Sequence, residues 1–236
     1  MALPNIEIKD FVGSLHLPKG QDEDARIRTA IAEFQNHYWV MFLTAQLFSD
    51  IRSTDPLPKK YEDLLLADFL DYKDKEGNKQ ILSVGVKGLI VSCIYSEAMK
   101  YQSRNTPTGY QKNKNENSKR ISGNQHRVNV SDRYNYSIIH YNSGVLPFIR
   151  AFQNRKEEIT SQSVSGSTLT IFCTYNQYLE VGDKVTIGGI AYPVLSVTEN
   201  ESFTIESANE LPESTFSYSP FPSEIEFEEL EIYLAL

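Results

Sequence analysis

Cysteine is scarce in this sequence, and its placement excludes several protein classes. The chain has 236 residues and only two cysteines, Cys93 and Cys173, which lie far apart on apolar stretches. A disulfide framework or a cysteine metal cluster needs more thiols at closer spacing. We therefore expect two buried free thiols, which suit a reducing interior.

The motifs that carry most enzyme chemistry are also missing. No GxxxxGK[ST], GxGxxG, HExxH, CxxC or GxSxG occurs. The four histidines, His16, His37, His126 and His140, are scattered and have no second ligand at metal-binding spacing. We therefore expect a protein that is not an enzyme, with no catalytic residue, no cofactor and no metal. A hydrolase built from dispersed Asp, Glu and His is the least favoured alternative.

Long apolar runs are absent as well. No stretch approaches the roughly 18 apolar residues that a membrane helix needs. Residues 1–11 lack the basic start and apolar core of a signal peptide. We expect a soluble, unexported chain with no membrane partner.

Charge is unevenly distributed along the chain. The net charge is −8, which argues against undirected affinity for nucleic acid. Residues 100–156 nevertheless hold 11 basic and 2 acidic residues, whereas residues 199–236 hold 10 glutamates and no lysine or arginine. The middle of the chain is basic and its end is acidic.

The first two thirds of the sequence have helical periodicity. A helix is expected to start at the acidic residues 21–24 and to run for about seven turns, up to Pro56. Its apolar stripe steps by three and four residues through Ile27, Ile31, Phe34, Tyr38, Met41, Ala45 and Phe48. Further helices are expected over 59–72, over 81–101 as the buried central helix, and over 134–152, where Gly144 and Pro147 bend or break the helix.

A long polar loop interrupts this helical region. Residues 103–125 contain almost no apolar side chain, so burial cannot offset the entropy of ordering them. Basic residues in and beside the loop are candidate contacts for DNA or for an acidic partner: Arg104, Lys112, Lys114, Lys119, Arg120, Arg127 and Arg133. A merely solvated loop is an equally weighted interpretation.

The last third has strand periodicity. Apolar residues alternate over 169–175, 184–187, 191–197 and 202–205, and Gly188-Gly189 is typical of a hairpin turn. An alternating run near the end of the chain predicts a terminal strand with a bulge at Glu228-Glu229. This strand either completes the module or pairs with the edge of a neighbour. Its glutamates are candidate subunit contacts: Glu226, Glu228, Glu229 and Glu231.

The expected fold class is therefore α+β. Residues 1–158 form a helical bundle of the connector type with the long loop 103–127, and residues 159–236 form a small β-module with a C-terminal strand.

Several sequence segments in the predicted helical region resemble segments of known proteins. The long helix carries Ala32-Glu33-Phe34 and leads to LFSD at 47–50; the buried helix carries IYSEAMKY at 94–101 and runs into NTPTGYQK at 105–112. The pattern over residues 20–156 resembles the head–tail connector or adaptor proteins of tailed bacteriophages, especially the neck ring proteins of crAss-like phages that infect Bacteroides-like hosts. The β-module from about residue 160 departs from the simplest adaptors.

The resemblance implies a structural subunit of a phage neck. Such subunits form a homo-oligomeric ring, often a dodecamer, that joins the portal protein to other neck or tail proteins and lets DNA pass through its lumen. The implied location is the virion, after synthesis in the cytoplasm of the bacterial host. A nucleic-acid-binding module that uses the basic loop is the alternative from a different class.

Overall fold

The structure, a computed structural model, describes residues 4–12, 21–67, 69–74, 77–82, 85–102 and 123–232. The chain divides into two compact units. The first, the helical unit, comprises the described residues up to 71, those of 78–147 and those from 227 onward; the second, the barrel unit, comprises those of 72–77 and 148–226. Each unit is described by itself.

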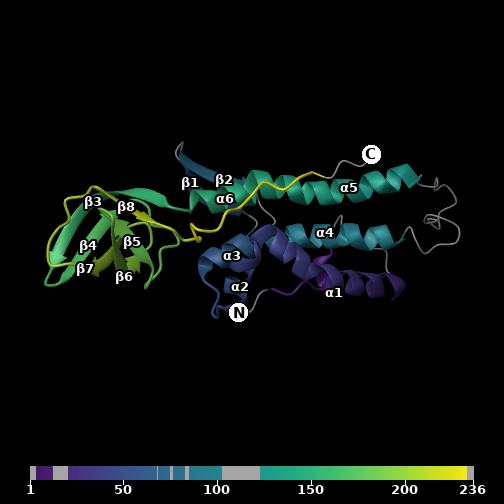
Figure 1. Ribbon diagram of the computed structural model, residues 1–236, viewed down its shortest axis with the longest axis horizontal. Helices are drawn as coiled ribbons and strands as arrows, with labels where there is room; N and C mark the ends of the chain where they lie inside the picture. The colour runs from purple at the N-terminus through teal and green to yellow at the C-terminus, as the bar shows by residue number, and fades with distance from the viewer. Residues whose placement is uncertain are drawn as a thin grey trace. The chain divides into compact units, whose positions relative to one another are not determined.

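Three long helices form the frame of the helical unit (Figure 1). They are α1 (Gln21–Leu43), α4 (Gly85–Gln102) and α5 (Gly123–His140). Helix α4 contacts both α1 and α5, and its side chains from Leu89 to Ile94 are all buried. This arrangement confirms the prediction that α4 is the central helix.

The predicted first helix is interrupted at one residue. Helix α1 ends at Leu43, and α2 (Ala45–Ser53) begins after Thr44. Leu47 and Ile51 of α2 are buried, whereas Ala45 is exposed and Phe48 is half-buried. The predicted stripe therefore holds as far as Met41, and its continuation through Ala45 was wrong.

The predicted second helix is also shorter than its pattern indicated. Helix α3 (Lys59–Leu66) is followed by a two-stranded sheet of β1 (Phe69–Asp74) and β2 (Gly77–Leu82). The residues expected to close a helix, 73–78, instead include the ends of these two strands. The short 3₁₀ helix η1 (Ile8–Asp10) precedes α1.

Helix α4 starts at a position that only glycine suits. Gly85 has φ +61, and a Cβ there would collide with the backbone of Leu65 and Leu66. A side chain would be strained by both the dihedral and the contact. The close approach of α3 to the start of α4 therefore depends on this glycine.

The end of helix α5 contains the helix distortion that the sequence predicted. A π-helical turn, η3 (Tyr141–Val145), contains Gly144 and joins α5 to α6 (Leu146–Ala151), whose first turn contains Pro147. Pro147 has no N–H group and therefore donates no backbone hydrogen bond to the preceding turn. The distortion predicted near Gly144 and Pro147 is thus a π-helical turn over Tyr141–Val145.

The β-module is a closed barrel, which overturns the predicted fold class. Its strands are β3 (Arg155–Ser165), β4 (Thr168–Cys173), β5 (Lys184–Ile187), β6 (Ile190–Thr198), β7 (Ser202–Glu206) and β8 (Thr215–Tyr218). The order around the barrel is β3-β4-β7-β6-β5-β8, with β8 pairing back to β3. We expected a small module completed by a C-terminal strand or paired with a neighbour's edge; closure leaves this sheet without an open edge.

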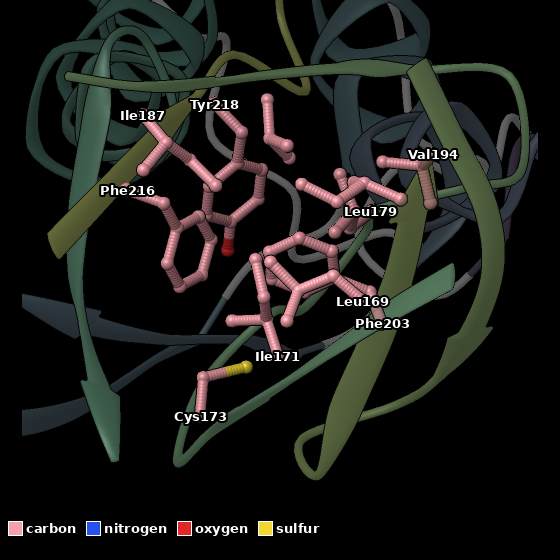
Figure 2. Packing of buried hydrophobic residues seen from close by; sticks show 11 residues of the cluster. Leu169, Ile171, Cys173, Leu179, Ile187, Val194, Phe203, Phe216 and Tyr218 are labelled. Carbon is pink, nitrogen blue, oxygen red and sulfur yellow. The ribbon is translucent and has the colours of Figure 1, made fainter. Parts of the chain in front are cut away.

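The barrel has its own apolar core. Figure 2 shows Leu169, Ile171, Phe203 and Phe216 converging inside the strands, with Cys173 and Tyr218 in the same cluster. The Phe203 and Phe216 ring centroids are 4.8 Å apart. The predicted hairpin at Gly188-Gly189 is confirmed, since Ile187 pairs with Ile190 on its two sides.

The described part of the predicted C-terminal strand, residues 225–232, is not a strand, and residues 233–236 lie outside the described residues. Residues 225–232 are assigned no strand, and β8 closes the barrel in place of the predicted C-terminal strand. The predicted bulge at Glu228-Glu229 therefore has no ladder to interrupt. The physical reason is that the side-chain amides of Asn142 and Gln153 hold this backbone in place of a neighbouring strand.

Candidate interaction surfaces

An acidic strap, defined as residues 224–232, carries the four glutamates that the sequence singled out. Ile225 and Phe227 are buried, at 7% and 3% exposure. Glu226, Glu228, Glu229 and Glu231 are all exposed, as is Glu224. Two buried apolar side chains thus anchor the segment, while its glutamates face solvent.

Two amide side chains fix the backbone of this strap. The Asn142 Nδ2 donates to the Leu230 carbonyl at 2.8 Å, and the Leu230 N–H donates to Asn142 Oδ1 at 2.9 Å. Within the barrel unit, Gln153 Nε2 donates to the carbonyls of Pro222 at 2.6 Å and Ile225 at 2.9 Å. Within the helical unit, residues 227–232 are therefore held by Asn142, which fixes the backbone that carries Glu228, Glu229 and Glu231.

Asn142 lies in the π-helical turn η3, which explains how it reaches the strap. A π turn widens the helix locally and such turns occur often at functional positions. Asn142 uses one donor and one acceptor to mimic the pairing of a neighbouring strand. Sequence reasoning missed both Asn142 and Gln153, because no local pattern distinguishes them from other helical amides.

The basic residues fall mostly outside the described part of the chain. Arg104, Lys112, Lys114, Lys119 and Arg120 lie outside the described residues, and Arg127 belongs to α5 without a described side chain. Arg133, also on α5, is half-buried. The side chain of one of the seven basic candidates is therefore described, and the predicted basic cluster lies outside the described residues.

A polar cluster joins the three long helices inside the helical unit. The Tyr38 hydroxyl on α1 donates to Glu97 Oε1 on α4 at 2.8 Å, and the Tyr134 hydroxyl on α5 lies 3.9 Å from Met41 Sδ. Burial raises the pKa of Tyr38 far above its ordinary value, and the pKa of Tyr134 is raised for the same reason. These phenols stay protonated and act as hydrogen-bond donors, so the cluster fastens helices together.

The two thiols are buried, as the sequence predicted. Burial raises the pKa of Cys173 to about 11, so the neutral thiol dominates at neutral pH. Thiolate, the nucleophilic form, is thereby disfavoured. Cys173 is part of the barrel core, and Cys93 is completely buried on α4.

The described residues contain no set of three His, Cys, Asp or Glu side chains placed to hold a metal ion. One open groove of about 450 Å³ lies between η1 and α1, lined by residues that include Ile6, Lys9, Arg28 and Ile31. Within the described part of the chain, no helix is both long enough and apolar enough to cross a membrane.

Comparison with known proteins identified no relative: no family model, no curated protein and no solved structure matches this chain.

Proposed function

We propose that this protein is a structural subunit of a tailed-phage neck, which forms a ring between the portal and the tail and leaves a channel for DNA. The observation that carries the proposal is the fixed acidic strap on a frame of long helices. The resemblance of residues 20–156 to connector proteins supplies the class of assembly. The virion is the location that follows from this function.

The strap suits a contact between identical subunits. Ring closure needs two different, complementary surfaces on each chain, so that each subunit binds the next in the same way. The exposed row of Glu226, Glu228, Glu229 and Glu231 supplies one of them. The basic segment 104–133 supplies the opposite charge, and charge complementarity sets the register of such a contact.

Rigidity of the strap strengthens this contact. Within the helical unit, Phe227 and the Asn142 amide fix the backbone beside Glu228, Glu229 and Glu231 before any partner binds. A preformed surface loses less conformational entropy on association than a flexible tail. The same acidic surface also repels DNA phosphates, which suits a conduit that DNA passes through without being gripped.

Charge reversal tests the contact. The variant Glu228→Lys/Glu229→Lys is expected to lower the fraction of oligomer measured by sedimentation velocity. Adding Lys119→Glu/Arg120→Glu to the same chain is expected to restore it, because the reversed charges again face each other. The matched control is Glu199→Lys/Glu201→Lys, which changes the net charge equally at exposed barrel positions.

Three outcomes are decisive. Loss with restoration supports head-to-tail pairing of the two segments. Loss without restoration places the strap against another partner surface. An oligomer unaffected by the strap reversal, or salt-dependent DNA binding by a monomer that depends on the basic segment, contradicts the proposal and favours the nucleic-acid-binding module.

A further inference from the structure

Thr44, which separates α1 from α2, has a backbone conformation that threonine rarely adopts. Its φ is 66° and its ψ is 160°. This region of dihedral space is essentially restricted to glycine, because a Cβ collides with the backbone there. Threonine is β-branched and is more constrained than most residues. Strain of this kind persists only where the surrounding structure imposes it.

The Thr44 side chain gains nothing from this conformation. Its hydroxyl is buried and has no hydrogen-bond partner. Thr44 occupies the N-cap of α2, where a threonine hydroxyl ordinarily accepts a bond from the first turn, yet no such side-chain bond forms. The Thr44 carbonyl accepts a bond from the Phe48 N–H at 3.1 Å. A buried hydroxyl without a partner adds a desolvation cost to the backbone strain.

Packing on both sides holds the break in place. Leu43, the last residue of α1, and Leu47 and Ile51 of α2 are completely buried. These contacts fix the position of α2 against the helical unit and force Thr44 into its strained dihedrals. The core contacts of these three residues therefore maintain the backbone strain at Thr44.

The sequence itself encodes no break at this position. Residues 21–53 contain no glycine and no proline. Helical spacing of apolar residues continues across Thr44, through Met41, Ala45 and Phe48. In the structure, however, Ala45 is exposed and Phe48 is half-buried, so this part of the stripe lies outside the core.

We propose that Thr44 is a conformational hinge, and that in a second state α1 and α2 join into one continuous helix from Gln21 to Ser53. Straightening moves Thr44 into helical dihedrals and relieves the strain. Its hydroxyl then bonds the Val40 carbonyl one turn earlier, as threonine does within helices. Met41, Ala45 and Phe48 align on one face of the straight helix and present a continuous apolar stripe. The inference does not depend on the proposed ring function.

Distance measurement between spin labels tests the hinge. Labels are attached at Arg28→Cys on α1 and Ser49→Cys on α2, both exposed positions, in a full-length chain whose Cys93 and Cys173 are replaced by alanine. A continuous helix separates the two Cα atoms by about 32 Å at 1.5 Å per residue. The bent state gives a shorter distance. Pulsed electron paramagnetic resonance resolves the two populations.

Two substitutions at one position drive the equilibrium in opposite directions. Thr44→Gly relaxes the bent state and weakens the helix, so only the short distance is expected. Thr44→Ala keeps the bent-state strain and favours the helix, so the population at about 32 Å is expected to grow. The ratio of straight to bent molecules is expected to differ between the two variants by at least about tenfold. Matched controls are Thr29→Gly and Thr29→Ala, at an exposed position within α1.

The melting temperature provides a second readout. Thr44→Gly is expected to raise it, because glycine accepts the observed dihedrals, whereas Thr29→Gly lowers it as glycine does within any helix. Opposite responses at the two positions, with opposite label distances for the two Thr44 variants, support the hinge. One short distance shared by the unsubstituted protein and both Thr44 variants overturns it. A Thr44→Gly variant that melts lower than the unsubstituted protein, as Thr29→Gly does, also overturns it.

Discussion

Arg155 shows how single residues stabilise the barrel unit. Its guanidinium carbon lies 5.1 Å from the Phe152 ring centroid and 4.1 Å from that of Tyr175. The Arg155 Nε is 2.6 Å from Glu157 Oε1, and both side chains are largely buried, at 7% and 11% exposure. The guanidinium charge is therefore paired with a carboxylate and stacked on aromatic rings at Arg155, the first residue of β3.

Removing Arg155 is expected to destabilise the protein strongly. Arg155→Ala leaves Glu157 as an unpaired buried charge, which costs about 3–5 kcal/mol. Arg155→Lys keeps the charge but loses the planar stacking, and about 1–2 kcal/mol is expected to be lost. Urea denaturation measures both. Lys156→Ala, at the exposed neighbouring position, is the control and is expected to change stability by less than about 0.5 kcal/mol. An Arg155→Ala chain as stable as this control would refute the assignment.

Cys173 is expected to make the folded protein less stable as the pH rises into the alkaline range. Burial raises its pKa from 9.0 to about 11 in the folded state. Between these values the unfolded chain releases the thiol proton and the folded chain retains it, so stability falls as pH rises. The slope from this group is at most about 1.4 kcal/mol per pH unit. Urea denaturation from pH 8 to pH 11 is expected to show this loss, and Cys173→Ala is expected to show a shallower one. Parallel curves for the two chains would contradict the assignment.

Individual elements separate what the sequence predicts from what it leaves open. Helix α4 was predictable because apolar residues of its own sequence cover a broad face of the helix. The β5–β6 hairpin was predictable because Gly188-Gly189 specifies the turn. Strand β8 was not, because its pairing with β3 joins residues about sixty positions apart in the chain. The β1–β2 pair was missed because its few apolar residues also fit a helical spacing. The break at Thr44 was missed because its cause is packing rather than local preference.

The junction between α3 and α4 gives a prediction at this scale. Gly85→Ala is expected to destabilise the protein by more than about 2 kcal/mol, because the new Cβ meets the Leu65 backbone in addition to the unfavourable φ. Gly166→Ala is the matched control: its φ is +64 but its surroundings are open. Only the conformational cost, about 1 kcal/mol, is expected there. Equal losses in thermal denaturation would show that the close approach to α3 is unimportant.

The acidic strap gives a second prediction for an element. Asn142→Ala removes both bonds to Leu230, so the strap is expected to detach more often and to be cleaved faster by a glutamate-specific protease at Glu228 and Glu229. Ser143→Ala, at the adjacent exposed position, is the control. Mass spectrometry of timed digests measures the cleavage rates. A rate for Asn142→Ala that equals the control would mean that the amide does not hold the strap.

At the scale of the whole molecule, the chain combines a helical unit with a closed barrel, and the candidate site is a surface rather than a cleft. The sequence pointed to the strap glutamates correctly as exposed residues but assigned them to a strand. The sequence also identified a basic segment over residues 104–133. That its side chains form one surface stays a prediction. Partner choice lies in the match between surfaces of different chains, which no single-chain pattern encodes.

Mass measurement in solution tests the proposed function most directly. Light scattering coupled to size-exclusion chromatography is carried out over a wide range of protein concentration, at low and at physiological salt. The account predicts a closed oligomer of uniform mass, a fixed multiple of the 26.9 kDa chain, that forms more readily at low salt. A monomer at every concentration and salt condition would contradict it.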